Sequence, residues 1–127
     1  MENEEVVTND EMNSLAMEII MQAGDARLFI ARALQAAAEG NFPELDKNID
    51  GARKKLAAAH GMQTEIVQSE GEGKKVNHTL LFIHAQDTLM TIYSELNMVK
   101  QLKPVLKRYD DRIAALERRY TNGDESN

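Results

Sequence analysis

The sequence predicts an all-α protein, a single domain over residues 1–127 that folds as an antiparallel three-helix bundle. The composition favours helices around an aliphatic core, because the chain has alanine runs, seven methionines, only two prolines and 5% aromatic residues. Apolar residues also recur every three or four positions along three long stretches, which is the spacing of one face of an α-helix. Short links join these stretches, so an up-down-up order is predicted.

A first helix is predicted from Thr8 to Gly40. Its start has the form of a capping box, because the Thr8 hydroxyl can accept a backbone N–H while Glu11 reaches back. Gly40 suits the left-handed conformation that often ends a helix. Gly24, inside this helix, is interpreted as a point where another helix approaches closely. The apolar stripe consists of Leu15, Ile19, Ala23, Ala26, Ile30, Ala33 and Ala37.

A second helix begins after Asn41, which can cap it, with Pro43 placed where no N–H donor is needed. The polar stretch 69–75 ends this helix. It contains Gly-Glu-Gly-Lys but lacks the preceding strand, the spacing and the Ser or Thr of a phosphate-binding motif, so a solvated loop is predicted. The apolar stripe consists of Leu45, Ile49, Ala52, Leu56, Ala59, Met62 and Ile66.

A third helix is predicted to be capped by Asn77, to run through residues 80–103, and to continue with a kink past Pro104 to about Arg119. Its core stripe consists of Leu81, Ala85, Leu89, Ile92, Leu96 and Val99. A second stripe lies about 135° around the same helix. It consists of Leu80, His84, Asp87, Thr91, Ser94 and Met98. A helix with two such faces needs two partners, so self-association is predicted.

The two ends of the chain, residues 1–8 and 121–127, are expected to be disordered tails. Between Lys100 and Tyr120, seven basic residues outnumber three acidic ones. Such a stretch forms either a solvated helix face or a docking surface for an acidic partner.

Several classes of function are excluded by composition. Because there is no cysteine, there is no disulfide, thiolate metal site or cysteine nucleophile. The net charge of −6 opposes general binding to nucleic acid or anionic membranes. The apolar stretch 80–83 is far too short to cross a membrane, and residues 1–18 are acidic without Lys or Arg, unlike a signal peptide. We therefore expect a cytoplasmic protein without direct membrane insertion.

His84 and Asp87 lie one turn apart on the second stripe, where a histidine could be either a satisfied interface residue or a reactive nucleophile. Asp87 could orient the histidine, coordinate a cation or fix the register of an interface. His60 and His78 are interpreted as helix-terminal residues. A di-iron carboxylate bundle is disfavoured because no Glu-x-x-His motif occurs.

The segment 83–91, Ile-His-Ala-Gln-Asp-Thr-Leu-Met-Thr, resembles the His-Ala-Gln-Asp-His-Leu-Met segment of a known family. That family is the IIA component of the lactose/cellobiose (chitobiose) branch of the bacterial phosphoenolpyruvate-dependent sugar phosphotransferase system. Residues 23–27, 39–42 and 59–64 resemble further stretches of the family in the same order, so the resemblance spans roughly residues 15–106.

The resemblance implies a homotrimer, a nine-helix bundle with the third helices around the three-fold axis. It implies that His84 accepts phosphate, on its tele nitrogen, from the histidine phosphocarrier protein and passes it to a cysteine of the IIB component. Asp87 matches the aspartate near the axis that is associated with one Mg²⁺ per trimer. Gln86 matches as well and is a candidate supporting residue.

One position departs from the family segment. Thr88 stands where the family has its second histidine, so Thr88 is a candidate supporting residue that offers a hydroxyl in place of a ring. Slower transfer, a different partner or a diverged role remain open on sequence alone. The alternative function is a trimeric helical adaptor or regulatory protein that has lost phosphotransfer. The sequence does not identify the sugar.

Overall fold

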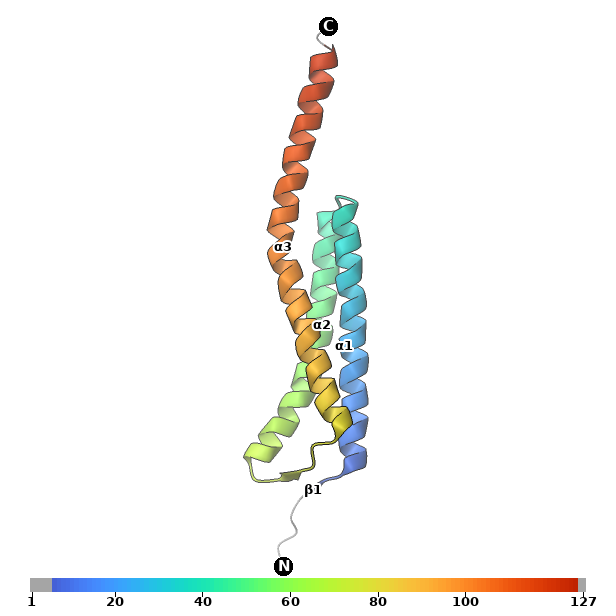
Figure 1. Cartoon of the computed structure of the whole chain (residues 1–127), viewed down its shortest axis with the longest axis vertical. Coiled ribbons are helices and arrows are strands. Elements are labelled where there is room, and N and C mark those ends of the chain that lie inside the picture. The colour runs from blue at the N-terminus through green and yellow to red at the C-terminus, as the bar shows by residue number, and fades with distance from the viewer. Residues whose placement is uncertain (1–5, 126–127) are drawn as a thin grey trace, which may run out of the picture.

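The structure, a computed structural model, describes residues 6–125 of the chain. Helices α1 (Asn9–Ala38), α2 (Phe42–Gly71) and α3 (Leu80–Glu125) run up, down and up (Figure 1), which confirms the predicted all-α three-helix fold. Two short strands, β1 (Val6–Val7) and β2 (Lys75–Val76), pair in parallel. The strands were not predicted, because two residues are too few to give an alternating pattern.

The predicted starts of the first two helices are confirmed. Thr8 Oγ1 accepts from the Glu11 N–H at 3.1 Å, and Glu11 Oε2 accepts from the Thr8 N–H at 3.0 Å. Asn41 Oδ1 accepts from the Glu44 N–H at 3.2 Å. Gly40, at φ +73°, adopts the predicted left-handed conformation in the turn between α1 and α2. These local signals fix both helix starts and the tight turn that makes α1 and α2 a hairpin.

The start of α3 differs from the prediction, because Thr79 rather than Asn77 caps it. Thr79 immediately precedes the first helical residue, and its Oγ1 accepts from the Phe82 N–H at 3.1 Å. Asn77 instead donates from Nδ2 to Asn9 Oδ1 at 2.8 Å, which ties the loop before α3 to the start of α1. This hydrogen bond therefore holds the N-terminal ends of α1 and α3 close together.

The far end of α3 also differs from the prediction. The helix continues through Pro104, as predicted, but ends at Glu125 and not near Arg119. Figure 1 shows that α3 changes direction in its orange section, which contains Pro104, in line with the predicted kink. Of the predicted disordered tails, residues 1–5 and 126–127 lie outside the described residues, whereas residues 6–8 form β1 and the α1 cap and residues 121–125 continue α3.

One aliphatic core lies between the three helices. Its largest fully buried side chains are Phe82, Met12, Ile19, Leu45, Leu56, Leu89, Ile92 and Leu96. The core stripe predicted for α3 is confirmed except at its first position, since Leu81 is half-buried and its neighbour Phe82 is buried. The larger Phe82 side chain, beside the Thr79 cap, fills the end of the core in place of Leu81.

The glycine at which two helices approach closely is Gly51, not Gly24. A Cβ added at Gly24 would meet nothing within 4 Å, whereas a Cβ added at Gly51 would lie 2.8 Å from two ring carbons of Phe29. The pairing of α1 with α2 therefore depends on a missing side chain at Gly51. The sequence pattern did not distinguish the two positions, because both glycines lie inside helices.

We expect Gly51→Val to lower the free energy of unfolding by about 1–3 kcal/mol, because the new side chain must displace the Phe29 ring. In contrast, Gly24→Ala should raise it by about 0.5–1 kcal/mol, because alanine lowers the entropy of the unfolded chain and meets no neighbour. Urea unfolding followed by circular dichroism measures both changes. Equal effects of the two substitutions would contradict the assigned helix contact.

Candidate functional site

His84 lies in the second turn of α3 with its side chain exposed. Within residues 6–125, no hydrogen bond, ion pair or ring contact engages its imidazole. Two exposed apolar side chains adjoin it along the helix, Leu80 at 83% and Ile83 at 43% exposure. The imidazole is therefore accessible to an incoming group, and apolar side chains are available beside it for a docking partner.

The neighbours of His84 on α3 fall on two sides of the helix. Asp87 is exposed one turn further on and shares the face of His84, as predicted. Thr88 is half-buried, and its hydroxyl donates to the His84 backbone carbonyl at 2.9 Å. Gln86 is half-buried and, two residues on, points from the opposite side of the helix. In this structure Asp87 and Thr88 lie near His84, and Gln86 does not.

The other two histidines have partners. His60 lies well inside α2, not at its end as predicted, and its ring meets the Tyr93 ring edge-on with centroids 6.0 Å apart. Burial raises the pKa of the Tyr93 phenol above its ordinary value, so the phenol stays protonated around neutral pH. His78 precedes α3, where its Nε2 lies 3.1 Å from Glu70 Oε2. Both histidines thus hold elements together, whereas His84 does not.

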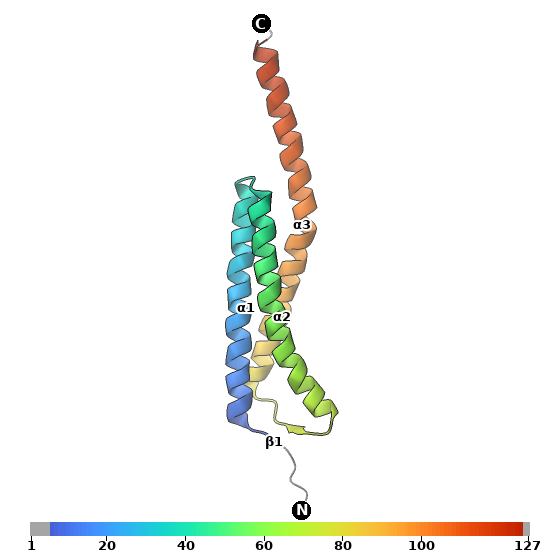
Figure 2. The ribbon, with the colours of Figure 1, turned by 180° about the vertical axis from the view of Figure 1, so that it is seen from behind.

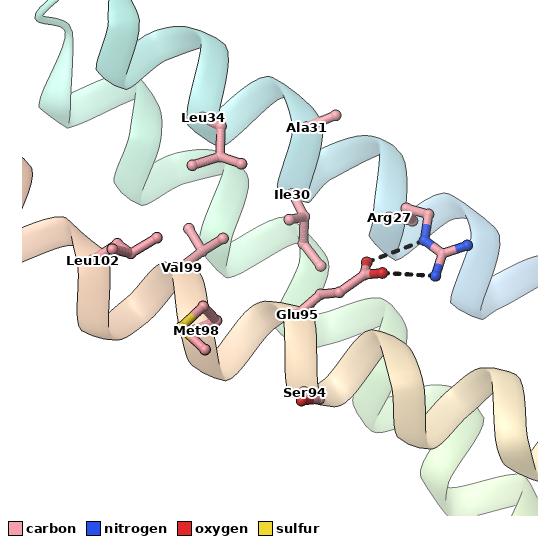
Figure 3. Close-up of a pocket in the computed structure, with 9 residues that line it drawn as sticks. All are labelled: Arg27, Ile30, Ala31, Leu34, Ser94, Glu95, Met98, Val99 and Leu102. Carbon is pink, nitrogen blue, oxygen red and sulfur yellow. Dashed lines mark hydrogen bonds and ion pairs between the residues drawn. The ribbon is translucent and has the colours of Figure 1, made fainter.

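The predicted second stripe of α3 is exposed along its whole length, from Leu80 to Met98. Near its upper end it borders an open groove of about 510 Å³ between α1 and α3 (Figure 3). The groove is lined by Arg27, Ile30, Ala31, Leu34, Ser94, Glu95, Met98, Val99 and Leu102. Its walls are mainly apolar. Within residues 6–125, this side of the protomer therefore presents an exposed face and, beside it, an open apolar groove.

A two-point ion pair closes one end of this groove. Arg27 Nε and Nη2 donate to the two carboxylate oxygens of Glu95 at 3.1 and 2.8 Å. The hydrogen bonds from Arg27 to Glu95 raise the pKa of the guanidinium further above its ordinary value. The sequence analysis did not single out this pair, although Arg27 lies in the matching stretch 23–27, because residues 68 positions apart give no local signal.

The chemistry available at His84 is nucleophilic attack by a neutral imidazole. The N-terminus of α3 carries a partial positive charge, and His84 lies about one turn from it, so an anionic group on this imidazole is favoured electrostatically. Asp87 is a hard oxygen ligand of the kind Mg²⁺ prefers. Among residues 6–125, however, no group of three or more His, Cys, Asp and Glu side chains is placed to hold a metal.

Comparison with known proteins identifies the family to which this chain is similar. The sequence profile of the family described as "PTS system, Lactose/Cellobiose specific IIA subunit" matches residues 14–107. The lichenan-specific phosphotransferase enzyme IIA component of Bacillus subtilis is 33% identical over 107 residues, which cover 84% of this chain and 97% of that protein.

Two solved structures have the same fold. The cellobiose-specific enzyme IIA from Bacillus anthracis superposes with a TM-score of 0.75 at 32% identity, covering 84% of this chain and 95% of that chain. The IIA(chitobiose) protein of Escherichia coli, solved in complex with HPr, gives a TM-score of 0.69 at 30% identity, covering 79% and 97%. The fold, the matched residues and the exposed His84 in its segment together place this chain in the lactose/cellobiose-specific IIA subunit family of the sugar phosphotransferase system.

Proposed function

We propose that this IIA component carries the phosphoryl group on His84, which accepts it from the histidine phosphocarrier protein and passes it to a cysteine of a IIB component. One observation carries the assignment: within the part of the chain that the structure describes, His84 is the one histidine of three whose exposed imidazole has no hydrogen-bond, ion-pair or ring partner. The solved complex of a related IIA protein with HPr supports the identity of the donor. The adaptor function without phosphotransfer is the outcome that would follow if no phosphate were taken up.

Each transfer exchanges one bond to phosphorus for another. The Nε2 lone pair of neutral His84 attacks phosphorus as the P–N bond of the donor phosphohistidine breaks and the donor imidazole is released. In the second step a IIB thiolate attacks the same phosphorus, the His84 P–N bond breaks, and the imidazole of His84 is restored. Catalysis then consists largely of aligning donor and acceptor and stabilising the phosphoryl oxygens, which the N-terminus of α3 assists.

The protein assembles, in this proposal, as a trimer through the second stripe of α3, which is exposed from Leu80 to Met98. Three copies would bring three Asp87 carboxylates together, and a bound Mg²⁺ would neutralise their mutual repulsion. One Asp87 per chain fits such a shared site and does not fit a site within a single protomer. Gln86, on the other side of α3, fits a role in supporting the helix better than contact with phosphate.

We place this carrier in the cytoplasm. Among the described residues, none of the helices contains an apolar stretch long enough to cross the bilayer. The sugar is chosen elsewhere in the transport system, and related IIA proteins are named for lichenan, lactose and cellobiose although their sequences are similarly related to this chain. Accordingly, we propose no sugar-binding role for the groove between α1 and α3.

Incubation with phosphoenolpyruvate, the first enzyme of the system and the histidine phosphocarrier protein tests the proposal. Intact mass should show one added phosphate that is lost in acid, and peptide mapping at neutral or alkaline pH should place it on His84. Omission of the phosphocarrier protein is the control and should prevent the gain. Phosphate on His60 or His78, or no phosphate at all, would overturn the assignment.

We expect Thr88→His to accelerate phosphate uptake or transfer to the IIB component roughly 5- to 30-fold, because a charge-assisted hydrogen bond to phosphate is stronger than a neutral one. In the parent the Thr88 hydroxyl already donates to the His84 carbonyl and has no second proton for a phosphoryl oxygen. Rapid-quench measurement of phosphohistidine formation gives the rate. Thr88→Val is the control, because it removes the hydroxyl at nearly constant size and so separates the contribution of the hydroxyl from that of the histidine ring. An unchanged rate in Thr88→His would show that threonine in place of the family's histidine has no effect on transfer.

A further inference from the structure

The C-terminal part of α3 extends beyond the rest of the protomer. The turn between α1 and α2 lies level with Asp110, since a Cβ placed at Gly40 would be 3.7 Å from Asp110 Oδ1. Figures 1 and 2 show from opposite sides that α3 continues well past this turn. Residues 108–125 also lie beyond the stretch 14–107 that matches the family profile. Most side chains of residues 108–120 are exposed, and an isolated helix of this length is only marginally stable in water, so burial of an apolar face against a partner would stabilise it.

A single exposed stripe runs along the whole of α3 into this extension. At about 100° per residue, its members lie within about 100° of arc. We call the following residues the α3 stripe: Leu80, His84, Asp87, Thr91, Ser94, Met98, Leu102, Val105, Tyr109, Ile113, Leu116 and Tyr120. In the extension its apolar side chains are open to solvent, with Ile113 at 55%, Leu116 at 61% and Tyr120 at 75% exposure. The apolar residues of this part of the stripe recur every three or four positions, as do the residues that form the contact between helices in a coiled coil.

The charges beside the stripe indicate whether a second copy of the helix would pack parallel or antiparallel to the first. On the helical wheel Arg112 borders one edge of the stripe and Glu117 the other. In a closed ring of parallel helices, each helix turns one edge to one neighbour and the opposite edge to the next, so Arg112 meets Glu117 of another copy. In an antiparallel pair, like edges would meet and like charges would repel. The side away from the stripe is solvated and carries the Lys107–Asp111 ion pair, at 2.6 Å.

We propose that the C-terminal extension of α3 is a stalk in which copies of this chain associate in parallel and in register through the apolar residues from Leu102 to Tyr120. The number of copies, three, rests on the trimer of the proposed function. The α3 stripe continues the face through which that trimer is proposed to form. Arg112 then lies at the edge of a self-association surface and is not part of a site for an acidic partner. The stalk holds the chains together at a distance from His84.

Cysteine substitution tests the arrangement directly, because the chain has no cysteine of its own. In oxidised full-length protein, Leu116→Cys should form a disulfide between copies at least tenfold faster than Arg118→Cys, which lies on the opposite side of the helix. Both residues are exposed in the protomer, so neither change threatens its fold. Equal rates for the two variants would overturn the stalk.

Charge reversal tests the direction of the helices. In sedimentation equilibrium at low salt, Glu117→Arg should weaken association at least threefold, and the double variant Arg112→Glu/Glu117→Arg should restore it. An unrestored double variant would exclude the parallel arrangement, and a parent that associates only when an acidic protein is added would favour the acidic partner instead. Leu116→Asp should weaken association at least tenfold while His84 is still phosphorylated, so a failed stalk is distinguishable from a failed phosphocarrier.

Discussion

His84→Ala is expected to abolish phosphate uptake from the histidine phosphocarrier protein. The reason is chemical, since removal of the imidazole removes the only exposed and unengaged nitrogen nucleophile among the three histidine side chains. The protomer should fold normally, because the His84 side chain is exposed and no side-chain contact is lost. Intact mass after incubation with the donor system measures the effect, and it should show no added phosphate at any time point.

Two matched variants make this result specific. His60→Gln and His78→Gln should each still take up one phosphate, even though they remove the ring contact with Tyr93 or the contact with the Glu70 carboxylate. His84→Gln keeps a polar side chain of similar reach without a nucleophilic ring and should behave as His84→Ala. If His84→Ala were labelled as fully as the parent, the site would lie elsewhere.

Removal of divalent cations is expected to weaken association of the parent protein at least tenfold at low salt. Without a cation, the three Asp87 carboxylates that meet in the proposed trimer repel one another. For two unit charges ~5 Å apart at an effective dielectric constant of about 20, this repulsion is about 3 kcal/mol. Some of it will be relieved by protonation of one carboxyl or by separation of the helices, which is why the stated effect is smaller than the sum of the pairs. Sedimentation with Mg²⁺ and with a chelator measures the change.

Asp87→Asn is the control for this experiment, because it keeps the shape of the side chain and removes the charge. Its association should not respond to chelation, and with chelator present it should associate more tightly than the parent. A parent protein that sediments as a monomer at micromolar concentration in Mg²⁺ would contradict the trimer. An equal response of Asp87→Asn to chelation would show that Asp87 is not the residue that senses the cation.

Local sequence signals predicted the parts of the fold that depend on neighbouring residues. The Thr8 capping box, the Asn41 cap and the left-handed Gly40 each involve groups within four residues, and the structure confirms all three. Helical spacing predicted the core stripe of α3, except at Leu81, and a second stripe on a separate face for the same reason. His84 and Asp87 were found by this route, because residues one turn apart share a helix face whatever the tertiary structure.

Features that depend on distant residues were missed. The cap of α3 was assigned to Asn77, whose side chain is instead bonded to Asn9 across the bundle. The close approach of two helices was assigned to Gly24, because the sequence does not reveal that Phe29 lies against Gly51. In each case a side chain was bonded or packed in a way that local pattern does not encode.

Two side-chain links, one from α1 to the loop before α3 and one from α1 to α3, have a consequence for the order of folding. Asn9 bonds Asn77 and Arg27 bonds Glu95, so both links join residues 68 positions apart. Closing so long a loop costs more chain entropy than closing the turn at Gly40, which brings α1 and α2 together. We therefore expect the hairpin of α1 and α2 to form early and α3 to dock late. We therefore expect α3, the helix that carries His84, to be the last to dock. Its backbone amides should also be the first to lose protection when hydrogen exchange reports local opening of the fold.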